Sequence, residues 1–322
     1  MPPRRRFGKR LVRSLLPIVL VILLAVLGPV GYIVSCVSRP TKRPYLVTPQ
    51  SFSQISGPAL KVTDESWSNR DGTRARGWLL KGAEGAPAVI LLHRYGADRS
   101  YVFNLGVKIN ETSGFTILWP DLRGHGMNPL VKWSALGGRE DQDVLAALDF
   151  LRNVKSDNKS KLVGDRFGIY GVELGAYSAL KAAKPDHQIR ALVLDSIPRS
   201  SNELLQTAIT NCTGIDNRTI DRMIKGLVVP ATRLYMLGAY DQTNACEVAA
   251  SIRDQRVLLL TGADAGYLIP ATASLLSCFP NQANVEIRTD LPLSGLNLPS
   301  ATGEQGEGYD RIVIDFFDRY LR

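Results

Sequence analysis

Short, mostly apolar runs alternate with amphipathic segments along most of the chain after residue 61. The runs lie at 86–93, 115–121, 165–171, 190–196, 256–262 and 284–290. Runs of this kind are typical of strands buried on both faces of a sheet. Helical spacing of apolar residues appears at 101–110, 138–154, 174–184 and 309–321. This alternation predicts a mainly parallel sheet with helices on both of its faces.

Two regions depart from this pattern. Asp71-Gly72 separates two extended stretches within 65–82, which predicts an antiparallel hairpin at one edge of the sheet. The interval 197–254 contains no buried strand and only scattered helical periodicity. An interval of this length between two strands is too long for a simple crossover, so we expect a helical cap at about 197–254.

The N-terminal region is organised around a long apolar segment. Residues 14–38 contain no charged side chain and are long enough to span a bilayer. Six basic residues precede the segment and three follow it closely, a bias that favours a cytoplasmic N-terminus at 1–13. We therefore expect a single-pass membrane protein whose main domain, 61–322, lies outside the cytoplasm after a Pro- and Ser-rich linker at 39–60.

Two alternatives to a retained anchor stay open. The apolar segment could be a cleaved secretory signal. It could also be a lipoprotein signal, because Ile33–Cys36 reads IVSC and resembles the bacterial lipobox, which would make Cys36 the lipidated residue. All three interpretations place the main domain outside the cytoplasm.

The formal charge of +9 does not indicate a nucleic-acid-binding surface. Nine basic residues flank the apolar segment, and the first acidic residue is Asp64. The remaining 30 basic residues equal the 30 acidic ones in number. We expect no nucleic-acid partner, because the main domain is formally neutral.

The cysteines do not form a metal-binding pattern. No CxxC motif or Cys/His cluster occurs, so we expect no metal and no cofactor. Cys212, Cys246 and Cys278 follow the apolar segment. An oxidising compartment would permit a disulfide, and Cys212 with Cys246 is the expected pair because both lie in the proposed cap. The alternative is that all three are buried thiols.

The stretch FGIYGVELGAYSAL at 167–180 reads as a strand, a tight turn and a helix. Gly171 and Gly175 flank the turn, and Glu173 lies at its tip. A side chain at such a tip lies at a helix N-terminus, where backbone N–H groups can stabilise negative charge. Small flanking residues are needed because the turn is tight.

Four motifs together resemble the α/β-hydrolase fold family, from about Trp67 to Leu321. LLHRYGADRS resembles the H-G-x-G loop, PDLRGHG resembles the loop after the next strand, and YGVELG resembles the nucleophile elbow G-x-S-x-G. IRALVLDS followed by a cap and then VLLLTG completes the order. The resemblance is to serine hydrolases of the esterase and acylaminopeptidase-like kind.

The resemblance also shows what this chain lacks. Glu173 stands where the family has its serine. The family's acid falls at Ala265 or Gly266 by spacing, and the adjacent Asp264 could substitute for it. Leu296 stands where a histidine is expected, and no histidine follows His187. The resemblance assigns the oxyanion-hole donors to the backbone N–H groups of Leu174 and of Arg94 or Tyr95.

Without a base, the family's mechanism cannot run, since a base must take the hydroxyl proton and later activate water. His93 and His125 are expected near the pocket as loop supports, with His125 as an alternative base. Arg94 could form a salt bridge with Glu173 across the old pocket, or it could point to solvent.

We therefore expect a catalytically degenerate hydrolase. It would be a binding module at the outer face of a membrane, holding a small acyl or peptide-like ligand, with an envelope protein as a further candidate partner. The alternative is an active hydrolase with a site rebuilt on Glu173, with His125 or Asp264 as its second group.

Overall fold

The computed structural model describes residues 5–56, 61–127, 129–215, 217–300 and 303–322. The chain divides into two compact units. One comprises the chain up to Ser38 together with Leu205–Leu237, and the other comprises Arg39–Leu204 and Gly238–Arg322. Parts of the predicted N-terminal segment and linker, residues 1–4 and 57–60, lie outside the described residues.

The larger unit is built on an eight-stranded sheet with the order β1-β2-β4-β3-β5-β6-β7-β8. Strand β2 pairs antiparallel with β1 and β4, and every other neighbouring pair is parallel. The strands are β1 (Val62–Ser68), β2 (Arg74–Leu80), β3 (Ala88–Leu92), β4 (Thr116–Pro120), β5 (Phe167–Val172), β6 (Ile189–Asp195), β7 (Arg256–Gly262) and β8 (Val285–Leu291). The predicted hairpin and all six predicted strands are confirmed.

The helices are α1 (Arg5–Ser38), α2 (Pro49–Ser56), α3 (Phe103–Ser113), α4 (Glu140–Asn153), α5 (Leu174–Ala183), α6 (Ser201–Thr213), α7 (Arg218–Tyr235), α8 (Ala245–Ala249), α9 (Leu268–Leu275) and α10 (Gly303–Leu321). Short 3-10 turns include η2 (Ala263–Ala265), η3 (Leu276–Cys278) and η5 (Gly295–Ser300). The described residues of 197–254 form helices and no strand of the sheet. The cap's limits stay a prediction.

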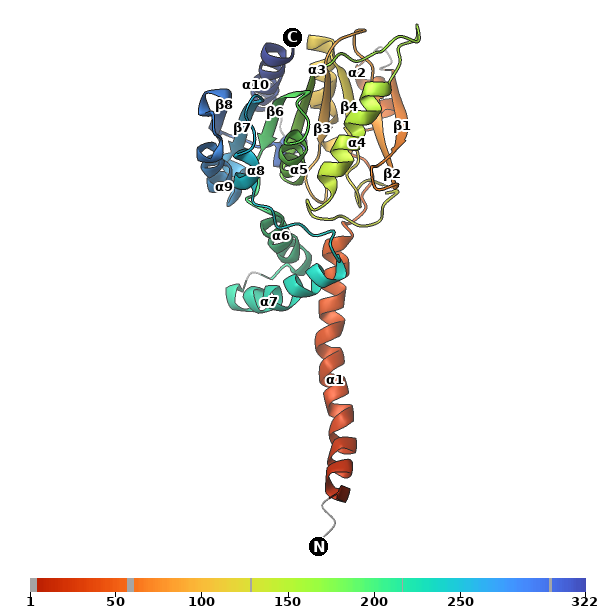
Figure 1. Ribbon diagram of the computed structural model, residues 1–322, viewed down its shortest axis with the longest axis vertical. Coiled ribbons are helices and arrows are strands. Elements are labelled where there is room, and N and C mark those ends of the chain that lie inside the picture. Colours follow the sequence, from red (N-terminus) through yellow and green to blue (C-terminus); the bar gives the residue numbers. More distant parts are fainter. Residues whose placement is uncertain (1–4, 57–60, 128, 216, 301–302) are drawn as a thin grey trace. The chain divides into compact units, whose positions relative to one another are not determined.

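Helices cover both faces of the sheet because successive strand residues point to opposite sides. Ala88, Ile90 and Leu92 of β3 pack in a core with residues of α4 and α5. Val89 and Leu91 of the same strand pack in a second core with α3 and α10. Figure 1 shows α4 and α5 in front of the strands. The mainly parallel, two-faced sheet predicted from the sequence is thus confirmed.

The expected linker contains ordered structure. Helix α2 lies within it, and Phe52 of this helix stacks edge-on against Phe103, with ring centroids 5.4 Å apart. Tyr45 contacts Trp78 in the same way at 5.1 Å. These aromatic contacts attach part of 39–60 to the face of the sheet covered by α3, since Trp78 and Phe103 belong to that core.

The expected Cys212–Cys246 disulfide is wrong. Cys212 is bonded to Cys36, and Cys246 is bonded to Cys278. Cys212 and Cys246 share the predicted cap, but they belong to different compact units, so closeness in sequence did not place them together. In this structure the Cys36 sulfur is already bonded, which leaves it no valence for the lipid thioether that the lipoprotein alternative requires.

Candidate functional site

The turn between β5 and α5 has the backbone of a tight elbow. Glu173 at its tip has φ +50° and ψ −104°, a strained conformation for a residue that is not glycine. A Cβ on Gly171 would lie 2.4 Å from the Gly175 carbonyl carbon, and a Cβ on Gly175 would lie 2.5 Å from the Leu92 oxygen. The packing of β3, β5 and α5 therefore requires both glycines.

The Glu173 carboxyl group is buried at this tip, with only 8% of the residue exposed. The backbone N–H of Tyr95 donates a hydrogen bond to Glu173 Oε2 at 3.1 Å. Burial raises the pKa of Glu173 to about 7, although the Arg94 charge and the Tyr95 hydrogen bond oppose the shift. One of the amides that the resemblance assigned to the oxyanion hole is thus already occupied by the residue at the nucleophile position.

Arg94 does not form the predicted salt bridge. Its Nε donates to the Leu296 carbonyl oxygen at 3.1 Å, and its Nη1 donates to the Tyr95 carbonyl oxygen at 3.2 Å. No ion pair within 4.0 Å includes Arg94 in the part of the chain that the structure describes. The half-buried guanidinium does not simply point to solvent either, because it ties the loop after β3 to the loop after β8.

The two candidate bases are buried and held by backbone groups. His93 Nδ1 lies 2.8 Å from the Arg94 oxygen, and its Nε2 accepts from the Leu122 N–H at 3.1 Å. His125 Nδ1 lies 2.8 Å from the Arg123 oxygen. Among the described residues, His125 Nε2 has no hydrogen-bond partner. Burial lowers the pKa of each imidazole to about 4, so both are neutral at pH 7.

Neither imidazole is hydrogen-bonded to Glu173. The His93 ring contacts the His125 ring edge-on, with centroids 5.1 Å apart, and the Tyr95 ring contacts His125 at 5.4 Å. Tyr95 therefore links Glu173 to the buried histidine pair, because its N–H binds Glu173 and its ring packs on His125. This arrangement gives Glu173 no imidazole partner for proton transfer.

Asp264 lies in η2, directly after β7, and binds the loop after β8. Its Oδ1 accepts from the Ser294 N–H at 2.7 Å, and its Oδ2 accepts from Asn297 Nδ2 at 2.7 Å and from Ser294 Oγ at 3.1 Å. Asp264 thus contacts the loop in which the resemblance placed the histidine, and its role as a catalytic acid stays a prediction. Its side-chain partners in that loop are Ser294 and Asn297. Leu296, which stands where the histidine was expected, binds Arg94 through its carbonyl oxygen instead. Asn297 could have been noticed as a polar residue within an apolar stretch.

A second carboxylate, Asp195 at the end of β6, also holds this loop and was missed by the sequence analysis. It accepts from the Gly295 N–H at 2.9 Å, the Tyr309 hydroxyl at 2.5 Å and the Ser196 hydroxyl at 2.6 Å. Burial raises the pKa of Asp195 to about 6. An aspartate that follows the apolar run Ala191–Leu194 at the end of β6 was the available signal.

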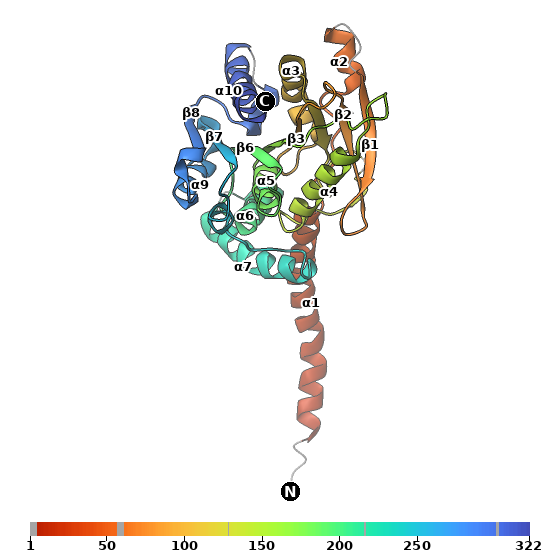
Figure 2. The same cartoon turned by 45° about the horizontal axis from the view of Figure 1, so that its top comes forward.

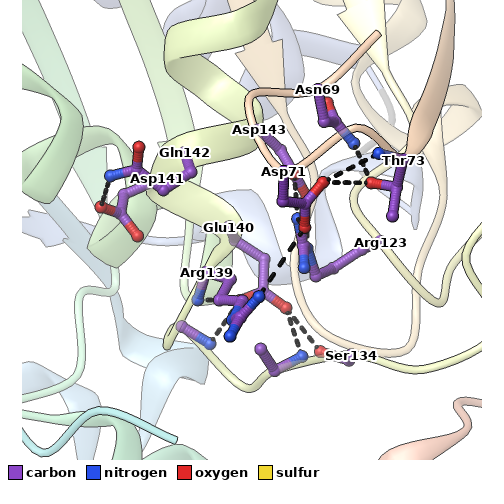
Figure 3. Close-up of polar contacts among 12 residues, drawn as sticks. Asn69, Asp71, Thr73, Arg123, Ser134, Arg139, Glu140, Asp141, Gln142 and Asp143 are labelled. Carbon is purple, nitrogen blue, oxygen red and sulfur yellow. Dashed lines mark hydrogen bonds and ion pairs between the residues drawn. The ribbon is translucent and has the colours of Figure 1, made fainter. Parts of the chain in front are cut away.

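Beyond the expected loop support, the PDLRGHG loop is fixed by a buried polar network (Figure 3). Arg123 Nε donates to Asp143 Oδ2 at 2.6 Å, and its Nη2 reaches Asp71 at 3.2 Å. The buried Glu140 carboxylate accepts from Ser134 Oγ at 2.8 Å and from the Gly137 N–H at 2.9 Å. These contacts hold the backbone to which His125 is bonded.

A cleft of about 490 Å³ lies beside Arg94 and the loop after β8. Arg94, Leu296 and Asn297 line it on one side. Lys108 also lines it and is paired with Glu307 at 2.8 Å and with Asp310 at 2.5 Å. Glu173 is not among the lining residues, so the cleft and the elbow adjoin through Arg94 rather than forming one open pocket. The described residues hold no group of three or more His, Cys, Asp or Glu side chains placed to bind a metal.

The sequence matches no protein-family profile. Over 124 residues it is 23% identical to a thiohydrolase of Aspergillus aculeatus, a match that covers 38% of this chain and 37% of that protein. The matched part is thus little more than a third of the curated relative's length.

Solved structures match over much more of the chain. An esterase of Pyrococcus furiosus has a TM-score of 0.66 and 19% identity, covering 88% of this chain and 100% of that one. An α/β hydrolase of a Penicillium species has a TM-score of 0.59 and 15% identity, with 81% and 99% covered. An acylaminoacyl peptidase of Pyrococcus horikoshii has a TM-score of 0.57 and 14% identity, with 86% and 44% covered. With the strand order and the elbow, these likenesses establish that the chain is an α/β-hydrolase-fold protein.

Proposed function

We propose that this chain is a membrane-anchored, catalytically degenerate α/β hydrolase that acts as an extracytoplasmic binding module. One observation carries the proposal. The residue at the nucleophile position is a buried glutamate whose carboxylate accepts the Tyr95 amide and has no imidazole within hydrogen-bonding distance. Serine-hydrolase chemistry needs a nucleophile, a base and free oxyanion donors; here a glutamate replaces the serine, no imidazole is hydrogen-bonded to it, and the Tyr95 amide is already taken by its carboxylate.

The anchor and the compartment are supported by three features. Helix α1 includes a span, Leu15–Ser38, long and apolar enough to cross a membrane. Basic residues are more numerous before it than after it, which favours a cytoplasmic N-terminus. Both disulfides, Cys36–Cys212 and Cys246–Cys278, are typical of an oxidising compartment, because cytosolic thiols are kept reduced.

The cleft beside Arg94 is the proposed ligand site. Lys108 in its wall is neutralised by Glu307 and Asp310, whereas Arg94 has no carboxylate within 4.0 Å in the described part of the chain. The Arg94 guanidinium donates to two carbonyl oxygens and lies over the Tyr101 ring, 5.3 Å from its centroid. A guanidinium held in this way favours an anionic ligand group, since an Arg–carboxylate pair is strong and directional. The ligand that fits best is a small acyl or peptide-like molecule with a free carboxylate.

The ligand proposal is tested by calorimetric titration of the full chain in detergent micelles with short fatty acids and N-acyl dipeptides. We expect Arg94→Met to weaken carboxylate binding by about 10- to 100-fold, the loss of a charge-assisted hydrogen bond. Lys108→Arg is the matched control, because it keeps the positive charge beside Glu307 and Asp310, and it should change affinity little. Equal binding of the corresponding methyl esters would contradict a carboxylate ligand.

The inactivity proposal is tested by measuring turnover of aryl esters and acyl thioesters by the full chain. Thioesters are included because the curated relative is named a thiohydrolase. We expect rates equal to the uncatalysed background, unchanged by Glu173→Gln.

A second candidate is an active hydrolase rebuilt on Glu173, with His125 or Asp264 as the second group. The observation that favours it is the pKa of Glu173, raised by burial to about 7, which is the range suited to a general base at neutral pH. In that case turnover would be present in the unmodified chain and would disappear in Glu173→Gln. The proposed envelope protein partner would instead appear as a co-purifying protein whose binding survives Arg94→Met.

A further inference from the structure

Helix α7 carries a stripe of large apolar side chains that the protein leaves exposed. Ile220, Met223, Leu227 and Leu234 are 48%, 68%, 55% and 71% exposed. Their spacing of three, four and seven residues places them within roughly 60° of one another around the helix. Single exposed apolar residues are ordinary, but a continuous stripe along one helix face marks a surface that binds something apolar.

The other side of α7 is basic and polar. Arg218 and Arg222 are exposed and lie away from the apolar stripe at helical spacing. Lys225 is half-buried and paired with Asp221 at 2.7 Å. Val228 and Thr232 are buried and form a third side. The helix therefore has a packed side, an exposed apolar stripe and an exposed basic side, the division typical of a helix at a bilayer surface.

The position of α7 in its own compact unit supports the same interpretation. Helix α7 packs against α1, and the disulfide Cys36–Cys212 ties the end of α1 to the end of α6, just before α7. Along α1, the apolar residues from Leu15 to Leu24 are exposed, whereas Ile33, Val34 and Val37 are buried. Figures 1 and 2 both show α7 running crosswise to α1 near the C-terminal end of α1.

These observations define one geometry. If α1 spans a bilayer, its exposed part occupies the hydrocarbon layer, and its buried end lies at the interface. A helix that crosses α1 there runs along the membrane surface. At that depth an exposed apolar stripe can contact the acyl chains while the exposed arginines reach the lipid phosphates.

We propose that α7 is an interfacial helix that lies in the headgroup layer of the bilayer, with Ile220, Met223, Leu227 and Leu234 inserted toward the acyl chains. The segment expected to cap the domain would then be a membrane-binding element. This proposal rests on the membrane anchor proposed above, and it does not depend on whether the elbow is active.

The test uses the full chain in liposomes that contain anionic phospholipid. Single cysteines are introduced by Met223→Cys and, as the matched control one residue away on the basic side, Arg222→Cys. Each is labelled with a small environment-sensitive fluorophore, and the native cysteines are protected by their disulfides. Quenching is measured with nitroxide-labelled lipids and with aqueous iodide.

We expect the lipid quencher to reduce emission at position 223 at least threefold more strongly than at position 222, and iodide to show the reverse order. Equal iodide quenching at the two positions would overturn the proposal. A blue-shifted signal at 223 that neither quencher reaches would also overturn it, since the stripe would then be covered by protein. Flotation after extraction of the same samples at alkaline pH reports separately on the anchor, because a chain held only by an interfacial helix would be released, whereas a bilayer-spanning chain would still float with the liposomes.

Discussion

The elbow at Glu173 and the loop after β8 have departed from the serine-hydrolase pattern in different ways. The elbow keeps its backbone and has a different side chain at its tip, with Gly171 and Gly175 still in place. The loop after β8 is bound by Asp264, and the side chains that meet this carboxylate are those of Ser294 and Asn297 rather than a histidine. One region has the tight turn with a glutamate at its tip, and the other has an aspartate that binds a serine and an asparagine.

The difference follows from what holds each region. The elbow is fixed by backbone contacts between β3, β5 and α5, which leave no room for a Cβ at either glycine. The loop is fixed by side chains, chiefly those of Asp195 and Asp264. A backbone-held turn tolerates any tip residue that accepts its φ and ψ, whereas a side-chain-held loop depends on particular polar groups.

The largest expected effect is that of Gly175→Ala. Its Cβ would lie 2.5 Å from the Leu92 backbone oxygen, so β3 or α5 must move. We expect a loss of about 3–5 kcal/mol in the free energy of unfolding. Urea titration followed by tryptophan fluorescence measures it, because all four tryptophans lie in the larger unit.

Gly308→Ala is the control for this substitution. Gly308 lies in α10 with no atom within 4 Å of an added Cβ. An alanine there should be neutral or should stabilise the helix by up to about 1 kcal/mol. Equal losses at the two glycines would mean that the elbow is not the tight turn described above.

The next effect is that of Asp195→Ala, which removes the β6 side chain that binds the loop after β8. The Gly295 N–H and the Tyr309 hydroxyl would be left buried without this acceptor. We expect a loss of about 3 kcal/mol, measured in the same way. Asp195→Asn keeps one acceptor oxygen and should lose less. If both variants lost the same free energy of unfolding, packing rather than hydrogen bonding would hold the loop after β8 against β6.

Most of the fold could be predicted because its signals are local. Buried parallel strands read as apolar runs, and the Asp71-Gly72 turn reads as a hairpin, so every strand appeared in the sequence. The disulfide pairing could not be predicted, because it depends on which compact unit each cysteine joins. Cys36 lay in the expected membrane segment and was not considered as a partner for Cys212.

Only those site residues that lie in recognisable sequence motifs could be predicted. Glu173, its glycines and the Tyr95 amide followed from the elbow and the loop after β3. Asp195 and Asn297 were missed because their roles depend on contacts with segments about 100 and 33 residues away. An Arg94–Glu173 pair was one of two alternatives for Arg94, the other being exposure to solvent, and in the structure the carbonyl oxygens of Tyr95 and Leu296 accept from the guanidinium instead.

A smaller effect on the free energy of unfolding is expected from Glu173, and its dependence on pH distinguishes the elbow from the loop after β8. Burial raises the pKa of Glu173 from 4.5 to about 7, so the folded state binds more protons than the unfolded state between those values. Its contribution to stability is complete below about pH 4.5 and is lost as the pH rises through 7. Glu173→Gln removes the titrating group.

We therefore expect the stability of Glu173→Gln relative to the unmodified chain to rise by about 2 kcal/mol between pH 5 and pH 8. Urea titrations of both proteins at each pH measure this difference, and the titration of all other groups cancels in the comparison. A difference that stays constant with pH would show that the Glu173 carboxyl group titrates at its ordinary value, and the buried arrangement at the elbow would then be wrong.

The smallest expected effect tests how much Asn297 contributes to holding the loop after β8 against Asp264. Its amide donates to Asp264 at 2.7 Å, but both side chains are exposed, so water can replace the bond at little cost. We expect Asn297→Ala to lose about 0.5 kcal/mol and Ser294→Ala, at a buried position on the same carboxylate, to lose about 1 kcal/mol. Urea titration at pH 7 resolves the order of the two losses. A loss above about 2 kcal/mol for Asn297→Ala would mean that this residue, and not the pair of aspartates, fixes the loop. The elbow would then still be held by its backbone, but the loop would be held mainly by the Asn297 side chain and not by the two carboxylates.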